Sequence, residues 1–179
     1  VGVFFLLLIL PAVNAEAKEV SLVKGDAIRY MGYSTHYYYV DGNLAFCLEP
    51  DMKSPGNGAY SASELDSKSH LSKAMYYMYG GPGYEQYIKS SLTGGWGEDA
   101  NAYCLTHCVL SYIYDGCDQN SAAFKGLNAD IASAVVMYAD YVKNLPDIPD
   151  AELAFSENGL TAYYDREQKC QRTQSIRLV

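Results

Sequence analysis

Residues 99–114 read DANAYCLTHCVLSYIY, and a helix formed by this stretch would be apolar on almost every side. A helix with that pattern is buried in the core of its domain, because a surface helix keeps one polar face for water. Gly116 follows as a stop signal. The stretch therefore predicts one central, buried helix around which the rest of the domain packs.

Helix signals continue on both sides of this central stretch. A helix capped by Ser63 or Ser69 would end at the Gly-Gly-Pro-Gly sequence of residues 80–83. Asn128 is a candidate N-cap for a further helix, which would stop before Pro146. We therefore expect an all-helical region between the two outer parts of the chain.

A hairpin precedes the helical region. Residues 37–40 and 44–48 are rich in apolar and aromatic side chains, and they flank an Asp-Gly pair at 41–42, which is a strong signal for a two-residue hairpin turn. Side chains alternate between the two faces of a strand, so Cys47 would share a face with Glu49 in the second strand.

Strand signals return after the helices. An Asn-Gly pair at residues 158–159 marks a second hairpin, and residues 170–179 predict a final strand. Strands, then helices, then strands predict an α+β fold, in which N- and C-terminal strands form a barrel-like or sandwich-like sheet with a helical insertion at about 60–145. That arrangement would bring Cys47 close to residues 170–176.

The composition is that of an acidic globular protein. The chain has 179 residues, 49% of them apolar, which is enough for one domain with a substantial core. The formal net charge of −8 argues against nucleic acid and anionic membrane surfaces as partners, since both attract basic proteins. The 18 tyrosines suit half-buried strands and wet interfaces, because each ring is apolar and each hydroxyl polar.

The first residues predict export. Residues 1–10 are almost purely apolar, and small residues that suit signal-peptide cleavage follow at 13–17. We expect residues 1–17 to be a partial signal peptide that is removed, and residues 18–179 to form the mature domain outside the cytoplasm. A buried core strand is the alternative interpretation of the apolar run, which is too short to span a membrane.

Five cysteines are present, so at least one is unpaired or used in chemistry. They are Cys47, Cys104, Cys108, Cys117 and Cys170. Cys104 and Cys108 lie one helical turn apart with His107 between them, but one rigid helix presents these three side chains poorly to a tetrahedral zinc ion. We expect packing thiols, or a disulfide from this helix to Cys117 or Cys170, and no metal or other cofactor.

Three short segments carry a pattern in a fixed order. Residues 46–49 read FCLE, residues 106–111 read THCVLS, and residues 170–174 read CQRTQ. Together they resemble the thioester domains of Gram-positive bacterial surface adhesins, in which a cysteine strand, a helical Thr-Gln segment and a late strand with a reactive glutamine follow one another. His107 and Ser111 stand where the family has Gln and Trp.

The resemblance implies that the Cys47 thiol attacks the side-chain amide of a late glutamine, releases ammonia and forms an internal thioester. Gln171 directly follows Cys170 and is favoured as the acyl donor, and Gln174 is the alternative. An amide barely reacts with a thiol in free solution, but orientation within one fold can supply effective molarities of ~10⁵ M or more. A Lys amine of a host or matrix surface protein would then attack the thioester and form an amide crosslink.

Three further residues could act in the same site. His107 would orient the thioester carbonyl or accept the amine proton, which a histidine can do near neutral pH. Thr106 would hydrogen-bond in the same site, and Glu49 would polarise it or accept a proton. Each residue also has a structural interpretation, respectively a satisfied core histidine, a hydroxyl bonded back to its own helix and a surface ion pair. Cys47 itself could be a small buried thiol, and either glutamine could lie on a solvated strand face.

Two other functions remain open beside this single-turnover, non-enzymatic binding. One is a secreted hydrolase with Cys47 as nucleophile and His107 as base, although such nucleophiles usually lie at a helix N-terminus, which lowers the thiol pKa. The other is a tyrosine-rich binding module without covalent chemistry. If the chain is an adhesin head, we expect it to be monomeric, with stalk repeats and a cell-wall anchor beyond Val179.

Overall fold

The computed structural model describes the chain in two units. The described residues are 18–63, 65–66, 69–149, 162–165, 167 and 169–173. The first unit ends at Ile148 and the second begins at Pro149, and each is described by itself. The predicted signal peptide, residues 1–17, lies outside the described residues.

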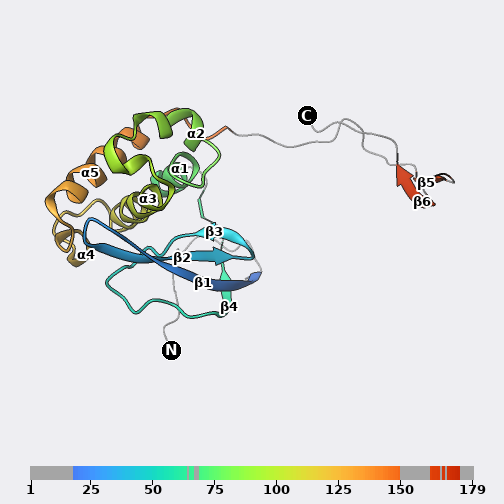
Figure 1. Cartoon of the computed structure of the whole chain (residues 1–179), viewed down its shortest axis with the longest axis horizontal. Helices are drawn as coiled ribbons and strands as arrows, with labels where there is room; N and C mark the ends of the chain where they lie inside the picture. The colour runs from blue at the N-terminus through green and yellow to red at the C-terminus, as the bar shows by residue number, and fades with distance from the viewer. Residues whose placement is uncertain are drawn as a thin grey trace, which may run out of the picture. The chain divides into compact units, whose positions relative to one another are not determined.

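Four antiparallel strands form the sheet of the first unit (Figure 1). They are β1 (Lys18–Tyr30), β2 (Tyr33–Val40), β3 (Asn43–Ala45) and β4 (Gly58–Ala62), in the spatial order β3-β2-β1-β4. Asp41 and Gly42 connect β2 to β3 with positive φ angles of 49° and 80°, so the predicted hairpin is confirmed. β4 pairs with β1 and has no counterpart among the sequence predictions.

The strand that leads to Cys47 is shorter than predicted. β3 ends at Ala45, so the placement of Cys47 on a strand is wrong, and the residue lies in an irregular segment. Helix hydroxyls replace the expected strand pairing. Tyr103 Oη donates to the Ala45 carbonyl at 2.8 Å, and Ser111 Oγ donates to the Leu48 carbonyl at 2.8 Å. These bonds satisfy backbone groups that a longer strand would have paired.

The helical region follows β4. Its segments are α1 (His70–Tyr77), α2 (Tyr84–Tyr87), η1 (Lys89–Ser91), η2 (Gly94–Gly97), α3 (Asp99–Tyr114), α4 (Ala122–Lys125) and α5 (Ala129–Lys143). Ser69 caps α1 and Asn128 caps α5, each accepting a hydrogen bond from a backbone N–H in the first turn. The central helix is confirmed with the bounds that the sequence predicts.

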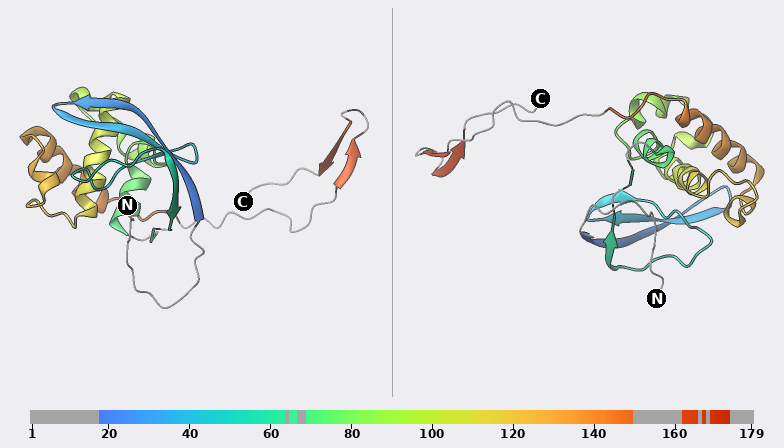
Figure 2. Two further views of the ribbon diagram at one scale, coloured as in Figure 1. Left: turned by 90° about the horizontal axis from the view of Figure 1, so that it is seen from below. Right: turned by 180° about the vertical axis from the view of Figure 1, so that it is seen from behind.

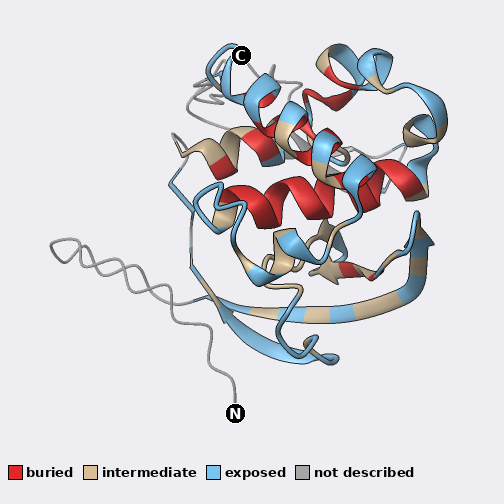
Figure 3. Ribbon diagram, turned by 90° about the vertical axis from the view of Figure 1, so that its left-hand side faces the viewer, coloured by how far each residue is buried: buried red, intermediate tan, exposed pale blue. Residues whose placement is uncertain are grey.

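α3 is the centre of the first unit. Its residues from 101 to 113 are all buried, and it contacts α1 and α5 as well as β1 and β2. The helices pack together on one face of the sheet (Figure 2). Buried residues, red in Figure 3, are concentrated in the helices, whereas only Thr35 and Tyr38 are buried in the strands of this unit. The α+β class is therefore confirmed, with the core on the helical side.

The second unit contains a short hairpin. β5 (Ala162–Asp165) and β6 (Cys170–Thr173) are antiparallel and form a two-stranded sheet of their own. The hairpin signal at residues 158–159 lies outside the described residues. The joining of C-terminal strands to the N-terminal sheet stays a prediction. In the described parts of both units, no helix is long and apolar enough to cross a membrane.

Candidate functional site

Cys47 and His107 line the same cavity. The cavity has a volume of about 410 Å³ and is walled by residues of β1, β2, the segment that follows β3, and α3. Arg29, Thr35 and His36 also line it. The tertiary structure therefore brings together the cysteine and the histidine that the sequence singles out.

The Cys47 thiol is half-buried beside the backbone of its own segment. Its Sγ donates a hydrogen bond to the carbonyl oxygen of Glu49 at 3.6 Å. Burial raises the pKa of the thiol, and the negative charges of Glu49 and Asp51 raise it further, whereas a backbone hydrogen bond with Glu49 lowers it. Cys47 is therefore a neutral thiol at neutral pH and needs a base to become a nucleophile.

His107 is almost completely buried, with 2% of its surface exposed. Its Nδ1 lies 2.7 Å from Thr35 Oγ1, so the two side chains share a hydrogen bond between α3 and β2. Its Nε2 is buried and has no hydrogen-bond partner among the described residues. Burial lowers the pKa of His107 to about 4, although an interaction with the backbone of Cys47 favours the protonated ring. The imidazole is therefore neutral at neutral pH and can accept a proton.

One row of α3 side chains holds the Cys47 segment in place. Tyr103, His107 and Ser111 recur every four residues, so they lie on one face of the helix. The outer two bind the backbone on either side of Cys47, and the ring of Phe46 stacks on Tyr103 with 4.7 Å between the ring centroids. The helix thus fixes the thiol segment at both ends and presents the imidazole between the two anchors.

Aromatic rings surround the imidazole. The ring of Tyr33 meets His107 edge-on with 5.7 Å between centroids, and that of Tyr103 does so at 6.4 Å. Burial raises the pKa of Tyr33 above its usual range, so its hydroxyl stays protonated. Such walls limit the access of water, which an activated acyl group requires if it is to survive hydrolysis.

The sequence of the first unit matches a known family. The match is to the thioester domain family and covers residues 19–149, more than half of the chain. The chain belongs to the thioester domain family. The matched range contains Cys47, Thr106 and His107, and it ends before Gln171 and Gln174. No curated protein and no solved structure matches the chain.

Thr106 and Glu49, which the sequence places in the site of the thioester domain, make contacts that differ from the predicted ones. Thr106 Oγ1 accepts a hydrogen bond from the Tyr79 backbone N–H at 3.1 Å, and Thr106 does not line the cavity of Cys47. Glu49 contacts the Cys47 thiol through its backbone carbonyl, and its carboxylate acts on the thiol as a nearby negative charge. The structural role of Thr106 is therefore to hold the turn after α1.

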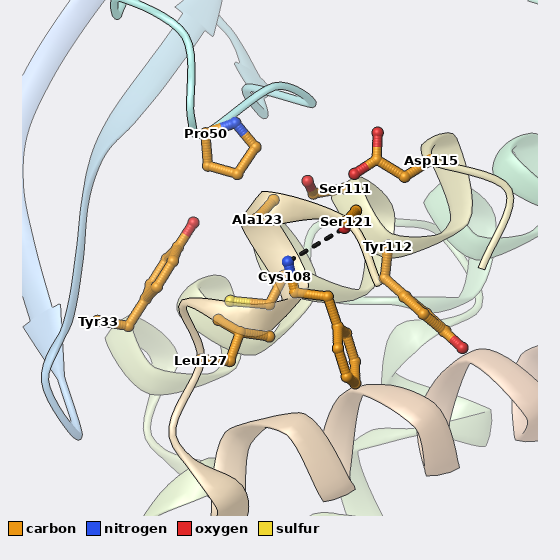
Figure 4. A pocket seen from close by; sticks show the side chains of 10 residues that line it. Tyr33, Pro50, Cys108, Ser111, Tyr112, Asp115, Ser121, Ala123 and Leu127 are labelled. Atoms are coloured by element: carbon orange, nitrogen blue, oxygen red, sulfur yellow. Dashed lines mark hydrogen bonds between the residues drawn. The ribbon is translucent and has the colours of Figure 1, made fainter. Parts of the chain in front are cut away.

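The other described cysteines of the thioester domain are free thiols. Cys104 and Cys108 are buried in α3, and burial raises their pKa values to about 11 and about 12. Cys108 lines a small pocket with Tyr33 (Figure 4). Cys117 is exposed and unpaired, so the alternative of a disulfide from α3 to Cys117 is wrong, and packing thiols describe this helix. In the described part of the chain, no three His, Cys, Asp or Glu side chains form a group that could hold a metal ion.

The two candidate acyl donors belong to the C-terminal part of the chain. Gln171 lies in β6, but its side chain is outside what the structure describes, and so is the whole of Gln174. The contact of Cys47 with either glutamine therefore stays a prediction.

Sequence reasoning missed Thr35 and the anchoring roles of Tyr103 and Ser111. Tyr103 and Ser111 each lie four residues from His107, and residues four apart on a helix share a face. Their spacing could therefore have predicted that they face the same site as His107. Thr35 had no such signal, since its contact with His107 joins residues 72 positions apart in the chain.

Proposed function

We propose that this thioester domain forms an internal thioester between Cys47 and Gln171 and uses it to capture an amine of a partner protein. One observation carries the proposal: the Cys47 thiol lines one cavity with a neutral imidazole whose Nε2 has no hydrogen-bond partner among the described residues. The aromatic side chains around His107 and membership of the thioester domain family support the same chemistry.

Formation of the thioester begins with a proton transfer. Because burial keeps Cys47 protonated, a base must take the thiol proton, and His107 is the neutral base on the same cavity. The sulfur then attacks the carbonyl carbon of the Gln171 amide, the C–N bond breaks, and the proton leaves with the nitrogen as ammonia. The product is an acyl group activated for attack by an amine.

We further propose that the domain is exported and displayed on a Gram-positive cell wall as the head of an adhesin. The apolar segment at residues 1–10 supports export. The target would be a Lys amine of a host or matrix surface protein, and the net charge of −8 favours a partner with a basic surface. Each domain reacts once, because the amide crosslink does not regenerate the thioester, so the activity is covalent binding without turnover.

The mass of the intact protein tests the proposal. Freshly purified full chain should be lighter than its sequence predicts by one ammonia, and methylamine should add to it and release one free thiol. Cys47→Ala should show neither effect. Cys104→Ala is the matched control, because it removes another buried thiol of the first unit and should leave both effects intact. An unmodified mass in fresh wild-type protein would refute the thioester.

Two further variants identify the acyl donor. Gln171→Ala should abolish the loss of ammonia, whereas Gln174→Ala should retain it. The opposite result would transfer the role to Gln174, and retention in both variants would refute a donor in this segment.

The hydrolase alternative is less consistent with the site. A Cys–His hydrolase needs a resting pair of thiolate and imidazolium, whereas thioester formation needs that proton transfer only once and transiently. Burial here raises the pKa of Cys47 and lowers that of His107, which opposes a resting charge pair.

A further inference from the structure

One polar atom at the cavity of Cys47 has no partner. His107 is 2% exposed and its Nε2 makes no hydrogen bond to the described residues, although the ring forms part of the cavity wall. Buried polar atoms in folded proteins are nearly always hydrogen-bonded, so an exception needs an explanation. Because His107 and Cys47 line the same cavity, the missing partner points to a group that arrives during the reaction.

The hydrogen bond to Thr35 bears on which nitrogen of His107 carries the proton. A neutral imidazole has one N–H donor and one lone-pair acceptor. A proton on Nε2 would leave a buried N–H without an acceptor, which is rarer than an unpaired acceptor. A proton on Nδ1 is instead donated to Thr35 Oγ1 across 2.7 Å, and Nε2 keeps a lone pair. The Nδ1–H tautomer therefore leaves only a lone pair unsatisfied, which costs less than an unsatisfied N–H.

We propose that Thr35 is a positioning residue for capture of the amine: its hydroxyl accepts the Nδ1–H of His107, so that the Nε2 lone pair in the cavity accepts a proton from an incoming primary amine. This inference rests on the proposed thioester. It adds the atom that acts as base, its tautomer, and the residue that sets the tautomer.

The reaction step balances without another reagent. The amine nitrogen attacks the carbonyl carbon of the thioester, the C–S bond breaks, and the electron pair leaves with Cys47 Sγ. The proton lost by the amine passes to His107 Nε2 and from there to the sulfur. The products are an amide, a neutral imidazole and a free thiol. During the transfer the imidazolium is stabilised by Thr35 Oγ1, which accepts its Nδ1–H.

Two other polar groups of the cavity, Arg29 and Tyr33, are poorer proton acceptors than a neutral imidazole. Arg29 carries a permanent positive charge, and Tyr33 keeps its proton because burial disfavours the phenolate. His36 is the other imidazole in the cavity wall. A measurement that reports on each histidine separately therefore distinguishes His36 from His107.

Long-range ¹H–¹⁵N NMR of the full chain reads the tautomer of each imidazole. The chain has 3 histidines, so the spectrum is simple to assign. His70 is an internal reference, because its Nε2 lies 3.0 Å from the Ala139 carbonyl, which can only accept a hydrogen bond. At neutral pH we expect an Nε2–H tautomer for His70 and an Nδ1–H tautomer for His107. An Nε2–H tautomer of His107 in the wild-type chain would overturn the inference, whatever the variants do.

The rate of methylamine addition tests the consequence for reactivity. Thr35→Val removes the hydroxyl and should slow the addition about tenfold or more, because a misplaced base loses most of its contribution to proton transfer. Thr35→Ser keeps the hydroxyl and should react at a rate within about threefold of wild type, since the acceptor for Nδ1–H remains. His107 should also shift towards the Nε2–H tautomer in Thr35→Val, but not in Thr35→Ser.

The outcomes separate this inference from the proposed function. If Thr35→Val loses one ammonia and reacts with methylamine as fast as wild type, the thioester stands and the role of Thr35 is refuted. If Thr35→Ser is as slow as Thr35→Val, the hydroxyl is not the group that matters. If wild-type protein shows no loss of ammonia, the proposed function fails, and the positioning role fails with it.

Discussion

A single buried imidazole connects the chemistry of the site to the stability of the fold. Burial lowers the pKa of His107 to about 4 from its ordinary value of 6.5. The folded protein therefore binds a proton on this residue more weakly than the unfolded chain does. The same burial that keeps His107 neutral at neutral pH makes the fold sensitive to acid.

Protonation of His107 should destabilise the fold as the pH falls. The unfolded chain takes up the proton below about pH 6.5, whereas the folded protein does so only below about pH 4, so stability is complete above this window and is lost on descending through it. The full effect is on the order of 3 kcal/mol. Urea denaturation at a series of pH values measures it.

His107→Gln is the control for that measurement, because glutamine does not titrate. Its free energy of unfolding should depend less steeply on pH between 4 and 6.5 than that of wild type. Equal slopes in the two proteins would show that His107 does not carry the effect.

At the scale of elements, the turn between α1 and α2 has no room for a side chain at Gly81. A Cβ there would overlap the carbonyl oxygens of Met75 and Tyr76. Both oxygens belong to the backbone of α1, so they cannot rotate away as a side chain could. The glycine allows the chain to pass close to the last turn of α1.

Gly81→Ala should destabilise the protein by about 2–3 kcal/mol, because the helix backbone must shift to relieve the overlap. Thermal unfolding measures the change. Gly97→Ala is the matched control, since no atom lies within 4 Å of a Cβ at that position, and it should change stability by less than about 0.5 kcal/mol. Equal losses in the two variants would contradict the steric explanation.

Asn128 links the start of α5 to the connection between β1 and β2. Its side chain accepts a hydrogen bond from the Ile131 N–H at the start of α5 and donates one to the Met31 carbonyl between β1 and β2. Asn128→Ala should cost about 1–2 kcal/mol in a denaturation experiment, since both bonds are lost. Asn128→Ser keeps the cap alone and should recover part of the loss. No difference between alanine and serine would argue against the cap.

At the scale of the whole molecule, the buried hydrophobic cluster and Cys47 belong to the first unit, whereas both candidate glutamines belong to the second. The buried hydrophobic cluster extends from Leu71 to Val142 and includes no residue beyond Ile148 among the described residues. We therefore expect the first unit to fold without the residues that would supply the acyl group of the proposed thioester.

A chain ending at Ile148 should unfold cooperatively and yet lack the thioester. It contains every residue of the buried hydrophobic cluster that the structure describes, but it has neither Gln171 nor Gln174 to acylate Cys47. Circular dichroism during heating tests the fold, and intact mass should equal that of the unmodified sequence. Loss of one ammonia in this shortened chain would show that the acyl donor lies in the first unit.

The sequence by itself determined the parts of the protein that depend on neighbouring residues. The bounds of α3, the Asn128 cap and the Asp41–Gly42 turn follow from periodicity, capping and turn chemistry over a few residues, and the structure has all three. The motif around Cys47 and the family were accessible for the same reason, since they are local patterns.

Only the tertiary structure decided which side chains meet. Thr35 reaches His107 across 72 positions and Ser111 reaches Leu48 across 63, and no local pattern encodes such pairs. The same holds for the end of β3 at Ala45, for the cavity that Cys47 shares with His107, and for the bond between Thr106 and the Tyr79 N–H. The physical reason is that a buried polar group must find a partner wherever packing brings one, and packing is a property of the whole core.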